Sequence, residues 1–201
     1  MIKLYGTAMS RSARCLWALE ELGLQYEHVP TAVADAKKPE HLKINPAGHI
    51  PALDDNGTVL FESMAINLYL AAKYGKAPFW PETHEDRGRA AQWSFWVMTE
   101  VEPHLITMLR QRLLNPPAQR DEKAAQQAAE ALKGPLKMLN DHLAGREWIL
   151  GKDFTIADLN VASVMSFAML VKLDMSATPA VQGWLQKGLS REANKKVRAM
   201  K

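Results

Sequence analysis

The order of secondary-structure signals in the first thirty residues is the feature that most restricts the fold. Residues 2–5 predict a short apolar strand. Residues 12–22 follow with apolar side chains at helical spacing, and Gly23 then supplies a C-terminal stop signal. A second strand is predicted at residues 26–29. Such a strand–helix–strand start implies that the two strands pair in parallel through a right-handed crossover.

The next segment predicts a hairpin followed by a helix. After a short helical signal, residues 50–53 and 59–61 form two apolar runs. Asn56-Gly57 lies between them and is the strongest short hairpin signal in the chain. Ser63 is predicted to cap the helix that follows. The resulting order, β-α-β-α-β-β-α with Pro51 at the start of the third strand, is typical of a thioredoxin-like domain.

The composition changes near residue 76, where a segment with two prolines predicts a linker to about residue 81. Beyond it strand signals disappear, and five helical patterns follow. They cover residues 84–114, residues 121–143 with a kink at Gly134-Pro135, residues 155–171, a helix from residue 178 and a last short helix from residue 190. The third of these is apolar on nearly all sides and is expected to be central. Thr155 and Asp158 at its start are expected to form a structural capping pair rather than a catalytic one.

Composition excludes several classes of protein. Apolar residues make up 47% of the 201 residues, which is enough for a substantial core, and the formal net charge is only +3. The mixed charges include no basic run with interleaved aromatics, which argues against nucleic acid as a partner. A single cysteine, Cys15, excludes a disulfide within the chain. The start shows no leader pattern, and the most apolar stretch, residues 161–171, is too short to span a bilayer, so we expect a soluble cytoplasmic protein with no membrane partner.

Four separated motifs carry a resemblance that covers nearly the whole chain. They are Lys3-Leu4-Tyr5-Gly6 with Met9-Ser10, Asn45-Pro46-Ala47-Gly48-His49-Ile50-Pro51-Ala52-Leu53, Phe61-Glu62-Ser63-Met64-Ala65-Ile66, and Phe154-Thr155-Ile156-Ala157-Asp158. In this order and spacing they resemble the cytosolic glutathione S-transferases, in particular the serine-type phi and theta classes. The resemblance implies a thioredoxin-like glutathione-binding domain at residues 1–76, a linker at residues 77–83 and an all-helical domain at residues 84–201.

The resemblance also implies an activity. Such an enzyme binds glutathione, ionises its thiol and conjugates it to small hydrophobic electrophiles, a reaction that serves detoxification. Glutathione is then the co-substrate, no other cofactor or metal is implied, and a homodimer is expected. A glutathione-dependent isomerase or peroxidase, or a non-catalytic binding or adaptor protein with this fold, remains an alternative.

Ser10 is the implied catalytic residue, because serine-type transferases place a serine after the first strand to donate a hydrogen bond to the glutathione sulfur. A free thiol with a pKa of about 8.5 is only a few per cent ionised at neutral pH. Lowering that pKa by about two units would make the thiolate the major form. Ser12 and Tyr5 are alternatives, although Ser12 suits the first turn of the helix and Tyr5 suits packing within the strand. Cys15 lies inside the helix and is expected to be a buried small hydrophobe.

Further residues are implied to bind glutathione. Pro51 is expected to follow a cis peptide bond, so that the backbone of Ile50 pairs with the cysteinyl backbone of glutathione like an added strand. Glu62 suits the γ-glutamyl amino group as a counter-charge. Ser63 and the N–H groups at its helix start suit the γ-glutamyl carboxylate.

Two weaker candidates lie nearby. Lys37 or Lys38 could meet the glycine carboxylate, although solvated surface lysines explain both almost as well. His49 is a candidate for the edge of the site.

The second-substrate pocket is expected between the Ser10 loop and the first long helix. Its candidate residues are Trp96, Met98, Glu102 and Leu105. A plain core or dimer-surface role for Trp93, Trp96 and Met98 has at least equal weight.

Overall fold

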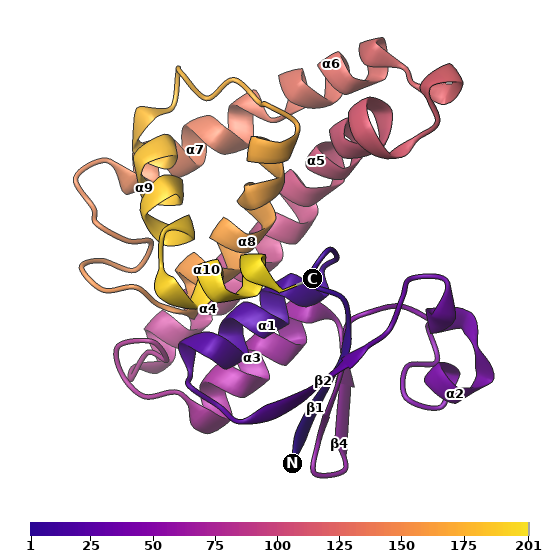
Figure 1. The fold of residues 1–201 in the computed structure, drawn as a ribbon. Helices are drawn as coiled ribbons and strands as arrows, with labels where there is room; N and C mark the ends of the chain where they lie inside the picture. Colours follow the sequence, from indigo (N-terminus) through magenta and orange to yellow (C-terminus); the bar gives the residue numbers. More distant parts are fainter. Residues whose placement is uncertain (201) are drawn as a thin grey trace. The chain divides into compact units, whose positions relative to one another are not determined.

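The computed structural model describes residues 1–200, which form two compact units (Figure 1). The first unit comprises Met1–Pro81 together with the C-terminal segment that begins at Ser190. The second comprises Glu82–Leu189. Within residues 1–200, no helix combines the length and the apolar character that crossing a bilayer requires.

A four-stranded sheet with the order β2-β1-β3-β4 forms the centre of the first unit. Its strands are β1 (Ile2–Gly6), β2 (Tyr26–Pro30), β3 (Ala52–Asp55) and β4 (Thr58–Phe61). As predicted, β1 and β2 pair in parallel, whereas β3 pairs antiparallel to both β1 and β4. The β3–β4 turn is the predicted Asn56-Gly57, with φ values of 52° and 92°. Both are positive, as the tight turn of a hairpin requires.

Two helices, α1 (Ser12–Glu21) and α3 (Ser63–Tyr74), pack on the sheet of the first unit. The unit also contains the short α2 (Pro39–Leu42), between β2 and β3, and α10 (Glu192–Ala199), which packs on α1. The helices α1 and α3 lie side by side (Figure 1), and fully buried side chains such as Leu4 and Leu16 form the core. Side chains alternate along a strand, so Tyr5 faces away from Leu4. Its ring meets that of His41 on α2 edge to face, at 6.3 Å between centroids.

The C-terminal helix corrects the predicted domain boundary. The resemblance implies one helical domain at residues 84–201, but α10 packs on α1 and belongs to the first unit. Arg191, just before α10, forms an ion pair with Glu21 at the end of α1. Both the packing and the ion pair join segments about 170 positions apart, which no local sequence pattern reveals.

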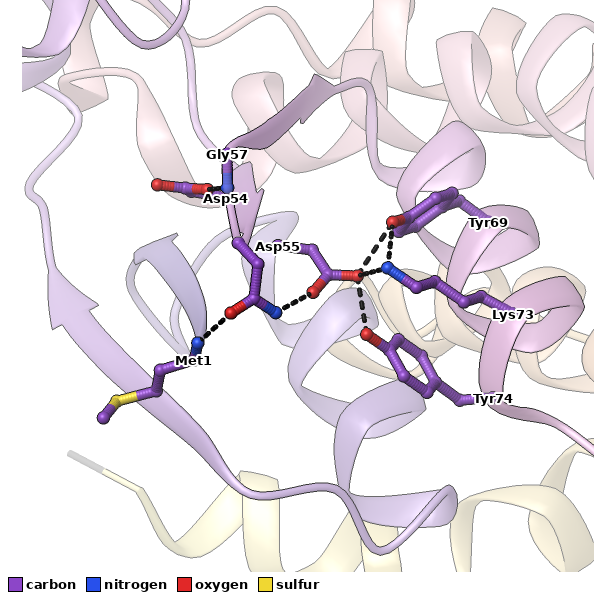
Figure 2. A network of polar contacts seen from close by, with 8 residues as sticks. Met1, Asp54, Asp55, Gly57, Tyr69, Lys73 and Tyr74 are labelled. Atoms are coloured by element: carbon purple, nitrogen blue, oxygen red, sulfur yellow. Dashed lines mark hydrogen bonds and ion pairs between the residues drawn. The ribbon is translucent and has the colours of Figure 1, made fainter.

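A buried carboxylate, Asp55, ties β3 to α3 (Figure 2). Its Oδ2 accepts hydrogen bonds from Lys73 and Tyr74, each at 2.7 Å, and from Tyr69 at 2.8 Å. Its Oδ1 accepts from Asn56 at 2.8 Å. Burial acts to raise the pKa of Asp55, but the hydrogen bonds from Lys73, the two tyrosines and Asn56 outweigh it. The pKa of Asp55 is therefore held well below its ordinary value.

The second unit is helical. Its helices are α4 (His84–Trp96), α5 (Glu102–Leu109), α6 (Glu122–Ala131), α7 (Lys133–Leu143), α8 (Ile156–Leu170) and α9 (Pro179–Leu189), with π-helical turns at Val97–Val101 and Arg110–Leu114 and a 3₁₀ turn at Pro117–Gln119. Together, α4, α5 and the π-helical turns cover the predicted long helix of residues 84–114. The turn at 97–101 lies just before Pro103, which has no N–H to donate and whose ring crowds the preceding turn.

Two other predictions for this unit hold. The helix predicted for residues 121–143 breaks at Leu132, between α6 and α7. Pro135 explains the position of the break, because a proline ring clashes with the carbonyl four residues earlier. The helix α8 is buried from Ile156 to Met165 and starts with the predicted capping box, in which Asp158 accepts from the N–H of Thr155 at 3.0 Å.

Candidate functional site

Strand register places three loops of the first unit at one edge of the sheet. Tyr5 pairs with Ala52, and Ala52 pairs with Phe61. The end of β1, the start of β3 and the end of β4 therefore meet at this edge. The segments that carry the predicted site residues extend from these three points.

Ser10 lies in the loop between β1 and α1. Its Oγ is 2.8 Å from the carbonyl oxygen of Thr7 and 2.9 Å from the Oγ of Ser12. The N–H of Ser12, the first residue of α1, donates to the Oγ of Ser10 at 3.1 Å. A half-buried hydroxyl is thus fixed at a helix start, where the partial positive charge favours an anion.

Ser12 itself is completely buried. Its side chain turns back toward Gly6, where a Cβ would lie only 1.9 Å from the Ser12 Oγ. Gly6 has a φ of 148°, which other residues rarely adopt, so both the conformation and the space at this position require glycine. Of the two serines, Ser10 is therefore the one with an accessible hydroxyl.

The other two candidates from this segment, Tyr5 and Cys15, contact other parts of the first unit. Tyr5 lies inside β1 and packs against His41, as its place in the strand pattern indicated. Cys15 is fully buried on α1, and its Sγ lies 3.6 Å from the carbonyl oxygen of Ser63. Burial raises the pKa of the Cys15 thiol far above its ordinary value, which keeps it protonated.

The segment before β3 presents free backbone groups. The Ile50–Pro51 bond is cis, as predicted. The preceding carbonyl, that of His49, accepts from His41 Nε2 and from Asn45 Nδ2, each at 2.8 Å. The N–H and C=O of Ile50 make no hydrogen bond within residues 1–200. An extended ligand backbone could pair with them.

The start of α3 corrects one prediction. Ser63 was expected to cap this helix, but Glu62 occupies the cap position without a side-chain bond to the helix, and Ser63 is the first helical residue. Glu62 has a φ of 70°, a strained conformation for a residue with a side chain. Its side chain is exposed, whereas Ser63 is buried.

Arg14 is a further candidate residue, which the sequence motifs did not predict. It is 2% exposed on α1, and its Nη1 donates to the Oγ of Ser63 at 3.3 Å. Its carbonyl accepts from Asn67 on α3, also at 3.3 Å. A buried guanidinium thus lies behind the N-terminus of α3. The sequence signal for this residue is an arginine on the apolar face of the predicted helix of residues 12–22. Charged side chains are rarely buried unless they have a partner.

The two lysine candidates differ in their surroundings. Lys38 forms an ion pair with Asp35 at 2.7 Å. Lys37 donates to the carbonyl of Ala47 at 3.2 Å and passes over Gly48, in the loop that leads to Ile50. The side chain of His49 is exposed.

The predicted electrophile-pocket residues all belong to the second unit. Trp96 and Met98 are partly exposed, whereas Glu102 and Leu105 are buried. Trp96 packs edge to face on the buried Trp93, at 4.9 Å between centroids. Because Leu105 is buried, its surroundings are those of a core residue. Contact between substrate and any of the four predicted residues remains a prediction.

Comparison with known proteins covers both units. The family model for the "Glutathione S-transferase, N-terminal domain" matches residues 1–72, and that for the C-terminal domain matches residues 99–192. Glutathione S-transferase 1 of Zea mays is 36% identical over 99% of this chain and 96% of its own length. GstB of Escherichia coli K12 is 30% identical over 98% of this chain and 97% of its own length. The structure of glutathione S-transferase-I bound with lactoylglutathione superimposes with a TM-score of 0.89 at 33% identity, covering 98% of both chains. These matches agree with the predicted thioredoxin-like domain followed by a helical domain.

Proposed function

Because the chain belongs to the glutathione S-transferase family, we propose that it binds glutathione at the described sheet edge and conjugates it to small hydrophobic electrophiles. The observation that carries this proposal is the Ser10 hydroxyl, accessible at the start of α1 and fixed by the N–H of Ser12 at 3.1 Å.

In the proposed mechanism Ser10 stabilises the thiolate and does not attack the substrate. Its O–H turns from the Thr7 carbonyl toward the glutathione sulfur, while its oxygen keeps accepting from Ser12. The start of α1 adds a favourable partial charge. Together they lower the pKa of the bound thiol by about two units, which corresponds to about 2.7 kcal/mol. The thiol proton passes to solvent, and the thiolate attacks the electrophilic carbon. With an aryl halide the new carbon–sulfur bond of the thioether replaces the carbon–halogen bond, and halide leaves.

The same edge offers partners for the rest of glutathione. The free N–H and C=O of Ile50 suit the cysteinyl backbone. The γ-glutamyl carboxylate suits the start of α3, where Ser63 is supported by the buried Arg14. Glu62 suits the γ-glutamyl amino group, and Lys37 suits the glycine carboxylate. The ligand named in the structure of glutathione S-transferase-I, lactoylglutathione, supports a site for glutathione derivatives.

The proposal includes three properties that rest on family resemblance. Glutathione serves as co-substrate and no further cofactor is required. Two copies of the chain form a homodimer, which sedimentation analysis tests. The protein acts in the cytoplasm, which fractionation of the source cells tests.

The test is the Ser10→Ala variant, with Ser166→Ala as a control that removes a half-buried hydroxyl from the second unit. Conjugation of an aryl halide and ultraviolet absorbance of the bound thiolate are measured across pH. We expect kcat/KM of Ser10→Ala to fall about a hundredfold and the pKa of bound glutathione to return toward about 8.5. Calorimetry near pH 5.5, where the bound thiol is protonated in both proteins, should show nearly unchanged glutathione affinity. Unchanged activity of Ser10→Ala would overturn the mechanism, and binding without turnover in the wild type would favour the adaptor alternative.

A further inference from the structure

The turn between β3 and β4 joins an asparagine to a glycine, and the two residues carry groups that can react with each other. Asn56 is the one asparagine of the sequence that is followed by glycine. The backbone nitrogen of Gly57 is therefore a nucleophile without a hindering side chain, directly beside the amide of Asn56. Both residues are exposed, and a Cβ built on Gly57 would meet no other residue within 4 Å. The turn thus offers both the space for the reaction and access for water.

Asp54 places a base at this nucleophile (Figure 2). Its Oδ1 accepts a hydrogen bond from the N–H of Gly57 at 2.7 Å, at the short end of the range for an N–H donor. The carboxylate is therefore within direct reach of the proton that the Gly57 nitrogen must lose, which is the geometric requirement for a general base.

The amide of Asn56, which the nucleophile would attack, has a charged partner at each end. Its Nδ2 donates to Oδ1 of Asp55 at 2.8 Å, and its Oδ1 accepts from the amino group of Met1. A positive charge at the carbonyl oxygen stabilises the negative charge that develops there when Cγ is attacked. A nucleophile, a base and a polarised carbonyl group therefore meet at one turn.

We propose that Asn56-Gly57 is a self-modifying site, at which Asn56 loses its side-chain amide in the folded protein. Asp54 takes the proton from the Gly57 nitrogen, which bonds to Cγ of Asn56. The bond from Cγ to Nδ2 breaks, and the nitrogen takes up this proton and leaves as ammonia. Water then opens the cyclic imide, either at Cγ to give aspartate or at the backbone carbonyl to give isoaspartate. The reaction needs only water and does not depend on glutathione or on the proposed transferase function.

The modification changes the contact that ties β3 to α3. In the aspartate product a carboxylate oxygen replaces the Nδ2 that donates to Asp55, so Asp55 loses a donor and faces a like charge. The new charge pair with Met1 is exposed and contributes little. The isoaspartate product instead adds a methylene group to the main chain of the tight turn. We therefore expect both products to weaken the hold of Asp55 on Tyr69, Lys73 and Tyr74.

The test follows this site in the full-length protein, incubated at neutral pH below its unfolding temperature. Peptide mass spectrometry measures conversion of the Asn56 amide to a carboxyl group, and an isoaspartate methyltransferase detects the isoaspartate product. Asp54→Asn keeps an acceptor for the Gly57 N–H but removes the base. Glu27→Gln removes an exposed carboxylate from β2 of the same sheet and is the matched control. Each protein is also incubated unfolded in urea.

We expect Asp54→Asn to slow loss of the Asn56 amide at least about tenfold in the folded protein, and Glu27→Gln to leave the rate unchanged. In urea, where the turn no longer fixes Asp54, the wild type and Asp54→Asn should react at the same rate. An intact Asn56 in the folded wild type, or equal rates in the folded wild type and Asp54→Asn, would overturn the proposal. A rate difference that persists undiminished in urea would do so too, because it would assign the effect to the local sequence and not to the folded turn.

Asn56→Asp tests the effect of the modification on the fold. This variant should melt about 3 °C below the wild type, because Asp55 loses one donor and gains a like-charged neighbour. Glu27→Gln, which alters a solvent-exposed ion pair, should melt with the wild type. An unchanged melting temperature of Asn56→Asp would overturn the proposed weakening of the contact between β3 and α3.

Discussion

Ser12 holds the hydroxyl of Ser10 from a completely buried position. Its N–H donates to the Oγ of Ser10 at 3.1 Å, and the two hydroxyl oxygens are 2.9 Å apart. The two serines, which are alternatives for the catalytic hydroxyl in the sequence, therefore have different roles in the structure. Ser10 presents the accessible hydroxyl, and Ser12 restricts where that hydroxyl can point.

Ser12→Ala should give an intermediate loss of activity. The variant keeps the N–H that donates to Ser10 but removes the hydroxyl partner, a hydrogen bond that contributes about 1 kcal/mol. We expect kcat/KM to fall about fivefold, with a smaller rise in the pKa of bound glutathione than in Ser10→Ala. Steady-state kinetics and thiolate absorbance across pH measure both quantities. A loss as large as that of Ser10→Ala would instead assign the thiolate contact to Ser12.

Arg14→Met should weaken glutathione binding without slowing the chemical step. Methionine fills most of the same buried space but removes the donor to Ser63 and the positive charge behind α3. We expect KM for glutathione to rise about tenfold while kcat changes little, because one charged hydrogen bond contributes about 1.5 kcal/mol or more. Thermal unfolding monitors the fold, since an apolar replacement of a buried charge is often tolerated. An unchanged KM would show that Arg14 serves the core alone.

Asp55 should make the first unit sensitive to acid. Its pKa is depressed in the folded state, so the unfolded chain binds a proton first as the pH falls. The stabilisation from Asp55 is complete above the pKa of the carboxyl group in the unfolded chain, about 3.9, and is lost progressively below it. Denaturant unfolding at neutral pH and near pH 3 measures this difference.

Asp55→Asn provides the matched comparison for that measurement. It should lower the free energy of unfolding at neutral pH by about 2 kcal/mol, because Lys73 loses its charged partner. The variant should also lose less free energy of unfolding than the wild type between neutral pH and pH 3. An equal acid dependence in both proteins would mean that other carboxyl groups cause it.

Local sequence signals predicted most of the secondary structure. The Asn56-Gly57 turn, the capping box at Thr155, the break near Pro135 and the buried helix α8 all follow from residues a few positions apart. The predicted helix cap at Ser63 is the exception. Serine is a common cap, but here Glu62 takes the cap position in a strained conformation that a propensity cannot foresee.

The sequence by itself determined the two-part architecture, the family and the segments that carry the site, because backbone preferences and short motifs act between near neighbours. Only the tertiary structure decided that Ser12 is buried behind Ser10, that Arg14 supports Ser63 and that α10 belongs with the first unit. These outcomes depend on contacts between distant segments, where burial and the competition for hydrogen-bond partners select among options that the local sequence leaves open.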